Sequence, residues 1–155
     1  MEHSTRLAIE ADCVNLSHAF SYYIDHGRYE ELSRLFAEDG VLVRFGVPLE
    51  GRAQILAAIR ARPAGQFTRH AAFNRHFTEV SPDVCKAVWY HAVYYKPTDA
   101  RPPFEYDPQR SMLVDAYDTY TKTSEGWRIQ ERDVRIVMLP DEMRSHVPPQ
   151  GLVPR

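Results

Sequence analysis

The sequence lacks the features that would place the protein in a membrane, on a nucleic acid or in the secretory pathway. No apolar run approaches the ~20 residues that are needed to span a bilayer. Its 19 basic and 21 acidic residues nearly balance, so the net charge of −2 indicates no nucleic-acid or anionic-membrane partner. The first residues, MEHSTRLAIEADC, contain no basic stretch followed by an apolar one, so they do not form a signal peptide. We therefore expect a cytoplasmic protein.

The sequence is also poor in groups that would hold a metal or a nucleotide. Its two cysteines, Cys13 and Cys85, have no metal-ligand spacing, and we expect both to be buried, reduced thiols. The seven histidines lack the His-x-x-x-His or Glu-x-x-His spacing of a helical metal site. No glycine-rich loop is present that could cradle phosphates. We expect no metal and no cofactor.

The chain's 155 residues, 44% of them hydrophobic, suffice for one domain with a substantial core. The spacing of apolar residues, together with the glycines and the proline that follow, predicts helices over residues 5–26, 28–39 and 51–62. Runs rich in Val, Tyr, Phe and Ile predict strands over residues 41–46, 66–80, 84–95, 110–123 and 126–139. This order predicts an α+β domain over residues 1–140, with three N-terminal helices packed on a curved, mostly antiparallel sheet.

Two segments fall outside this pattern. The proline-rich segment 97–108 is too long for a tight hairpin, and we interpret it as a lid over a ligand. Residues 141–155 form a polar tail that we expect to be loosely held, and its end, GLVPR, looks like the residue of a thrombin cleavage tag. Because three helices cannot cover so large a sheet completely, we expect a cone-shaped ligand cavity between the two layers.

Four stretches carry a resemblance to a known family: YYIDHGRYEELSRLFAEDGVL, LEGRAQILAAI, TRHAAFN and YDTYTKTSEGWRIQER. In this order they resemble the SnoaL-like family of the nuclear transport factor 2-like superfamily, whose fold is that of scytalone dehydratase and ketosteroid isomerase, over roughly residues 6–139. The resemblance implies a cone-like α+β barrel that commonly dimerises through its sheet. We expect a homodimer, with a trimer as the alternative.

His70, in the stretch FTRHAAFNRHF, is the first candidate for catalysis. A histidine in such a stretch often faces the cavity in SnoaL-like proteins, and dehydratases of the family use it for proton transfer. Imidazole suits this role because its unperturbed pKa lies near neutrality. The alternative is a core or rim histidine bonded to the backbone. His76, near the end of the same predicted strand, is interpreted as structural.

Asp25 closes the first predicted helix, in the stretch YYIDHG. Relatives that resemble scytalone dehydratase have an aspartate at the matching point, where it orients a histidine; the alternative is a solvated residue at a helix end. Those relatives carry a tyrosine just before the aspartate, but Ile24 stands there in this chain. Tyr23 and Tyr22, one and two residues further back, are the candidates to polarise a substrate carbonyl, although core packing would equally explain one of them.

His91 and Asp118 are the remaining catalytic candidates. Alternation places His91 on the face of its strand that carries Trp89 and Val93, where it could be the partner of Asp25. Asp118 lies on the more apolar face of its own strand, where an inward aspartate would have a raised pKa and could transfer a proton. Arg132 is either the counter-ion of Asp118 or a surface residue.

The aromatic and amide side chains near these positions are the candidates to bind the substrate. They are Tyr22, Asn74, Trp89, Phe104 and Tyr120. Arg44 stands about where ketosteroid isomerases hold their base aspartate, which argues against that mechanism.

Together these residues predict a cofactor-independent lyase or isomerase that acts on a small hydrophobic, hydroxylated or carbonyl compound, such as a polyketide, steroid or aromatic derivative. The first alternative is a non-catalytic module for ligand binding or assembly. The second is an epoxide hydrolase, for which Asp118, Arg132 and another carboxylate could supply the residue types without the expected spacing.

Overall fold

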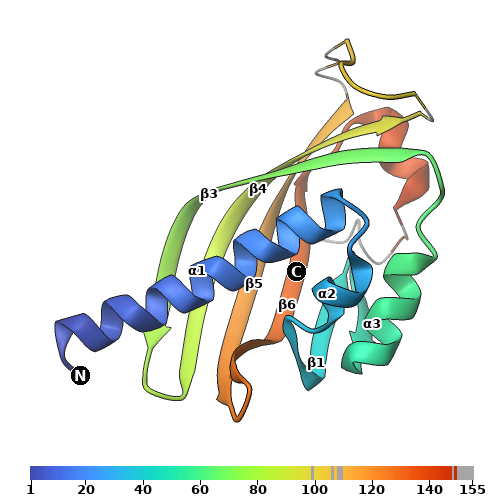
Figure 1. The fold of residues 1–155 in the computed structure, drawn as a ribbon. Helices are drawn as coiled ribbons and strands as arrows, with labels where there is room; N and C mark the ends of the chain where they lie inside the picture. Colours follow the sequence, from blue (N-terminus) through green and yellow to red (C-terminus); the bar gives the residue numbers. More distant parts are fainter. Residues whose placement is uncertain (99, 106, 108–109, 148, 150–155) are drawn as a thin grey trace.

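The computed structural model describes residues 1–98, 100–105, 107, 110–147 and 149 (Figure 1). In this part of the chain, three α-helices lie on one face of a curved, six-stranded sheet. The helices are α1 His3–Asp25, α2 Tyr29–Ser33 and α3 Gly51–Arg60. The strands are β1 Phe36–Arg44, β2 Val47–Glu50, β3 Gln66–Val80, β4 Val84–Pro97, β5 Ser111–Thr123 and β6 Gly126–Met138, and a 3₁₀ helix, η2, spans Asp141–His146.

The strand order is β2-β1-β6-β5-β4-β3, and β1 and β6 form the one parallel pair among the described strands. The predicted α+β class, with N-terminal helices on a mostly antiparallel sheet, is therefore confirmed. Figure 1 shows α1 running across the concave side of the sheet, while α2 and α3 pack beside β1 at one end. None of the described helices is long and apolar enough to cross a membrane.

The strands alternate between the two faces of the sheet as the sequence predicts. In β4, Trp89, His91 and Val93 are buried under the helices, whereas Tyr90 and Tyr94 on the other face are exposed. This alternation follows from the two-residue period of a strand. We expect a second copy of the chain to bind the apolar outer face. The homodimer stays a prediction.

The predicted second helix is wrong over residues 36–39. α2 ends at Ser33, and β1 already begins at Phe36, which pairs with Ile129 of β6. The helical spacing of apolar residues is misleading here, because a short helix is marginal without packing and Phe36 is fully buried as part of a strand. The ladder with β6 is irregular between Phe36 and Val41. Within this irregularity a Cβ on Gly40 would lie 2.9 Å from the Ile129 carbonyl oxygen, so glycine is needed for the two backbones to meet.

Two further expectations need correction. No strand was predicted over residues 47–50, but β2 lies there and contains Pro48, which is tolerated because β2 is an edge strand whose outer side needs no ladder bonds. The tail after residue 140 is not loosely held throughout, because Val147 is only 7% exposed and packs into the domain. The thrombin-tag residues 151–155 lie outside the described residues.

A buried ion pair joins β5 and β6 beneath α1. Arg132 Nε donates to Asp118 Oδ1 at 2.7 Å, and Arg132 Nη2 donates to Asp118 Oδ2 at 2.6 Å. The same Nη2 donates to Ser17 Oγ of α1 at 2.6 Å, and the Tyr120 hydroxyl donates to Asp118 Oδ2 at 2.5 Å. Arg132 is thus the counter-ion of Asp118, and both side chains are almost wholly buried, at 1% and 0% exposure.

This pair generates a prediction about stability. Asp118→Asn removes the negative charge and leaves the Arg132 guanidinium buried and uncompensated, so we expect the free energy of unfolding to fall by about 3–5 kcal/mol. The double variant Asp118→Leu with Arg132→Met removes both charges, and we expect it to lose less than Asp118→Asn alone. Urea unfolding at pH 7 measures both values.

Asp115→Asn is the matched control, since Asp115 lies on the same strand but on the opposite face of the sheet. We expect a change within about 0.5 kcal/mol for this variant. If Asp118→Asn unfolded with the same free energy as the Asp115 variant, the ion pair would not be the stabilising contact that its burial indicates.

Candidate active site

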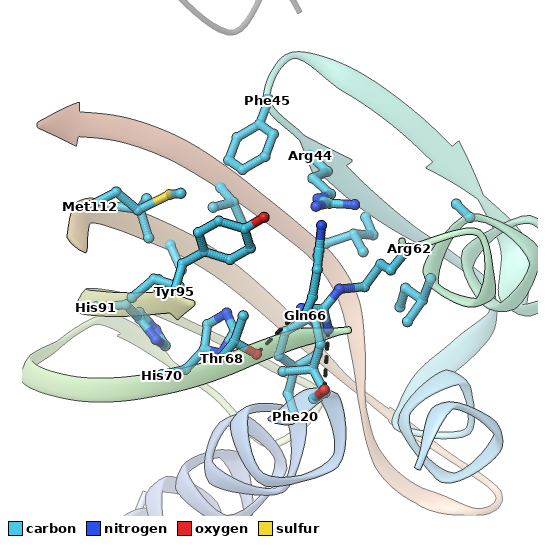
Figure 2. Close-up of a pocket in the computed structure, with 18 of the residues that line it drawn as sticks. Phe20, Arg44, Phe45, Arg62, Gln66, Thr68, His70, His91, Tyr95 and Met112 are labelled. Atoms are coloured by element: carbon cyan, nitrogen blue, oxygen red, sulfur yellow. Dashed lines mark hydrogen bonds between the residues drawn. The ribbon is translucent and has the colours of Figure 1, made fainter. Parts of the chain in front are cut away.

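A cavity of about 340 Å³ opens between the sheet and the helices. Its wall is mostly apolar, with residues from α1, from α3, from five strands and from the tail, and includes Phe20, Ile59, Val93, Met112, Val134 and Val147. The polar residues that line it are Arg44, Arg62, Gln66, Thr68, His70, His91, Tyr95 and Arg132 (Figure 2). An apolar cavity with a few convergent polar groups is the usual form of a small-molecule site.

Asp25 and His70 meet at the wall of this cavity. α1 ends at Asp25, and Gly27, with φ of +68°, turns the chain away. The Asp25 carboxylate then accepts three hydrogen bonds from β3: from Thr68 Oγ1 at 2.8 Å, from the His70 backbone N–H at 2.8 Å and from His70 Nδ1 at 2.6 Å. Thr68 and His70 face the carboxylate together because residues two apart on a strand share a face. The contact between Asp25 and His70 that the resemblance implies is present.

These bonds determine the protonation of the pair. Burial alone would raise the pKa of Asp25, but the hydrogen bonds and the charge of His70, with the bond from Thr68, hold that pKa below its usual value of 3.8. An ionised carboxylate only accepts hydrogen bonds, so His70 Nδ1 must carry the proton that it shares with Asp25. No described residue bonds His70 Nε2, and this nitrogen is left as a base for a ligand in the cavity.

His91 lies beside His70 but makes no contact with Asp25. The β3–β4 register opposes His70 to Val93 and His91 to Ala72, so the two histidines are diagonal neighbours on one face. His91 is 4% exposed, and its Nε2 has no hydrogen-bond partner among the described residues. Burial, followed by the positive charge of Arg132 and the nearby histidines, lowers the pKa of His91 to about 3. The imidazole is therefore neutral at pH 7.

Asp118 lies inward, as predicted, but it is not an isolated carboxyl group in an apolar cavity. Both of its oxygens are occupied by Arg132, and Tyr120 adds a third bond. It is absent from the described residues that line the cavity, whereas Arg132 is among them. The expectation of proton transfer by Asp118 is therefore corrected: its carboxylate is committed to holding Arg132.

The remaining predicted residues also lie away from the described cavity wall, each for an identifiable reason. Tyr22 is 52% exposed and stacks on His26, and Tyr23 packs against the Arg28 guanidinium. Trp89 is buried against His18, and Tyr120 is fully buried. The sequence pattern placed these aromatic residues on inward or partly inward faces, but helix rotation and packing against α1 decide which of them reach the cavity.

The two other substrate-binding candidates, Asn74 and Phe104, also lie away from the cavity wall. Asn74 is exposed at an irregularity in β3 and has φ of +48°, a conformation that asparagine tolerates better than most residues. Phe104 packs edge-on against Phe67 with ring centroids 4.9 Å apart, and is not among the described lining residues. Closure of the 97–108 segment over a ligand stays a prediction, and Tyr106, another aromatic residue of this segment, lies outside the described residues.

Four polar lining residues were missed by sequence reasoning: Arg62, Gln66, Thr68 and Tyr95. Thr68 and Tyr95 carried a usable signal, since each lies an even number of residues from a candidate histidine on its own strand. Arg62 and Gln66 flank the turn between α3 and β3, where no periodicity indicates direction. Among the described residues, no three His, Cys, Asp or Glu side chains gather closely enough to hold a metal ion.

Comparisons with known proteins agree with this fold. The SnoaL-like domain matches residues 5–133. A candidate scytalone dehydratase of Novosphingobium aromaticivorans superposes with a TM-score of 0.74 at 20% identity, over 88% of this chain and 89% of its own. A nuclear transport factor 2-like protein with a cystatin-like fold, from the same organism, has a TM-score of 0.69 at 24% identity, over 92% and 90% of the two chains.

A hexachlorocyclohexane dehydrochlorinase (LinA type 2) also superposes, with a TM-score of 0.71 at 15% identity over 88% of this chain and 90% of its own. No protein of curated function matches the chain significantly. At these identities the structural neighbours share the fold, while the domain match covers most of the chain. The chain therefore belongs to the SnoaL-like family.

Proposed function

We propose that this protein is a cofactor-independent lyase or isomerase that moves a proton on a small, largely hydrophobic carbonyl compound. His70 Nε2 removes a proton from the carbon next to the carbonyl, and the electron pair moves into an enolate. When the carbonyl re-forms, a hydroxyl on the β-carbon leaves with the proton that His70 returns, and the products are an enone and water. In an isomerisation the same proton returns to another carbon.

One observation carries this proposal: the bond of 2.6 Å between His70 Nδ1 and Asp25 at the wall of an apolar cavity. The carboxylate fixes the tautomer in which Nε2 is unprotonated, and it stabilises the imidazolium that forms after proton transfer. Because three hydrogen-bond donors keep Asp25 ionised against the effect of burial, its carboxylate can stabilise the positive charge that His70 gains on taking up a proton.

His91 supplies the second function that such a reaction needs. Its Nε2 is buried without a partner among the described residues and lies at the same cavity as His70 (Figure 2). A neutral imidazole with a proton on this nitrogen donates a hydrogen bond to the developing enolate oxygen without itself becoming an acid. Tyr95, whose hydroxyl group points into the cavity, replaces Tyr23 as the candidate phenol.

The names of two structural neighbours support an elimination, because a dehydratase removes water and a dehydrochlorinase removes hydrogen chloride. The two rival functions have less support. If the cavity had only a structural role, nothing would explain why His70 and His91 at its wall each have an Nε2 that bonds no described residue. An epoxide hydrolase needs two carboxylates and an arginine around a water, but no aspartate or glutamate is among the described lining residues.

The test uses ring ketones that carry a β-hydroxyl, such as 3-hydroxy-1-tetralone, whose dehydration yields 1-naphthol. The readouts are product absorbance and, for the whole panel, exchange of the proton next to the carbonyl in deuterated water. We expect His70→Asn to lower kcat/KM by about 10²- to 10⁴-fold, the usual contribution of general acid–base catalysis. Asp25→Asn should lower it less, because Nε2 remains while its orientation is lost.

His76→Asn is the matched control, since His76 is an exposed histidine of the same strand. It should leave the rates unchanged. Equal rates for the His70 and His76 variants on every exchanging substrate would refute proton transfer by His70 and favour a binding module.

The low pKa of His91 predicts a pH dependence of stability. Between pH 6.5 and about 3 the unfolded chain protonates this histidine while the folded chain does not. The contribution of neutral His91 is therefore fully present above pH 6.5 and is lost as the pH falls, by up to about 1.4 kcal/mol for each pH unit. Urea unfolding between pH 7 and 4.5 should give a flatter dependence for His91→Gln than for the unmodified chain.

His76→Gln is the control for this series and should keep the original slope, because its side chain is exposed. The slope is informative even where His91→Gln lowers stability at every pH. Identical slopes for all three proteins would mean that His91 titrates normally in the folded state.

A further inference from the structure

Arg44 is a cation without a partner at the mouth of the cavity. It ends β1, lines the cavity and is at the same time exposed to solvent. Among the described residues, none forms a hydrogen bond or ion pair with its guanidinium, whose carbon lies over the Phe45 ring at 5.2 Å from the ring centroid. Nothing within the described chain explains why a guanidinium is directed here.

Arg62 adds a second positive charge on the same part of the wall. Its Nη1 donates to the Ile24 carbonyl oxygen at 3.1 Å, and its Nη2 donates to Thr68 Oγ1 at 3.3 Å. Both acceptors are neutral, so these bonds position Arg62 without cancelling its charge. Burial and then the charge of Arg62 lower the pKa of Arg44, as expected for two cations that face each other across a partly enclosed space.

No negative charge of the cavity wall offsets this pair. The described lining residues include no aspartate and no glutamate. Asp25 lies behind Thr68 and His70, which occupy its oxygens, and Asp118 is committed to Arg132. Figure 2 shows Arg44, Gln66 and Arg62 gathered on one part of the cavity, apart from His70 and His91.

The turn that presents Arg44 is strained. Phe45 and Gly46, between β1 and β2, have φ of +52° and +80°, the two positive values of a type I′ hairpin turn. Glycine adopts this conformation without cost, but a phenylalanine there is an outlier, and such strain clusters at ligand sites. The Phe45 ring lines the cavity beside Arg44, so the strained residue forms part of the wall.

We propose that the substrate of this site is a carboxylic acid whose carboxylate binds between Arg44 and Arg62, while its apolar ring reaches down to His70 and His91. This inference rests on the proposed function for its reaction and adds the substrate class. A guanidinium binds a carboxylate through two parallel hydrogen bonds, and the amide of Gln66 offers a further donor. A neutral analogue would fill the cavity and leave Arg44 desolvated and unpaired, so the site discriminates against it.

The test compares acids with their primary amides, which have nearly the same shape and no charge. The probes are 1-naphthoic acid, benzoic acid and cyclohexanecarboxylic acid, each with its amide, and calorimetry measures their Kd values at low ionic strength. We expect at least one acid to bind about 10- to 100-fold more tightly than its amide, and the preference to shrink as potassium chloride is added.

Arg44→Gln should abolish most of this preference by weakening acid binding about 10-fold or more, with little effect on amide binding. It should not lower the stability of the protein, because Arg44 bonds no described residue and its removal relieves the repulsion by Arg62. Arg34→Gln, which removes an exposed arginine outside the described cavity wall, is the matched control and should keep the preference.

The proposal is overturned if no acid binds more tightly than its amide, including the case in which no probe binds, or if Arg44→Gln retains the full preference. Because binding is measured without turnover, the two proposals fail separately. Acid preference without exchange or elimination on any substrate would remove the lyase or isomerase and keep the anion site. Turnover of neutral ketones without a preference for acids would remove the anion site and keep the lyase or isomerase.

Discussion

The Asp25 carboxylate ties the long helix to the sheet and also forms one half of the candidate catalytic pair. Burying an ionised group is costly unless donors surround it, and β3 supplies three of them within hydrogen-bond distance. A helical residue moves by about 100° for each step along the chain, so a register shift of α1 by one residue would remove this carboxylate from Thr68 and His70. The same bonds that hold the end of α1 on β3 therefore place an imidazole nitrogen at the cavity.

The cavity carries three arginines whose roles are distinguished by their partners. Arg132 is paired with Asp118 through Nε and Nη2, its Nη2 also bonds Ser17, and its burial makes it part of the core. Arg62 bonds neutral oxygens, and Arg44 bonds none of the described residues. An arginine that is paired with a carboxylate of the protein supports the fold. An arginine without such a partner is available to bind the carboxylate of a ligand.

This division suits a family in which one fold carries several chemistries. The groups that we propose for proton transfer lie on the long, paired strands β3 and β4 and on the end of α1, which is bonded to β3. The cationic part of the wall lies on the β1–β2 turn and on the segment after α3, which can change without disturbing the sheet. In the two proposals, reaction type and substrate choice therefore depend on different elements of the molecule.

Local pattern in the sequence determined the helices α1 and α3, the long strands and the inward direction of His91 and Asp118, because period and flanking glycine or proline residues act over a few positions. The bounds of β3 agree with prediction for this reason. Tertiary structure decided what depends on distant partners. Residues 36–39 became a strand because Phe36 pairs with β6, and Asp118 lost its expected role because Arg132, fourteen residues away, occupies it. Val147 and Arg62 reached the cavity through long-range packing, which no periodicity in the sequence can encode.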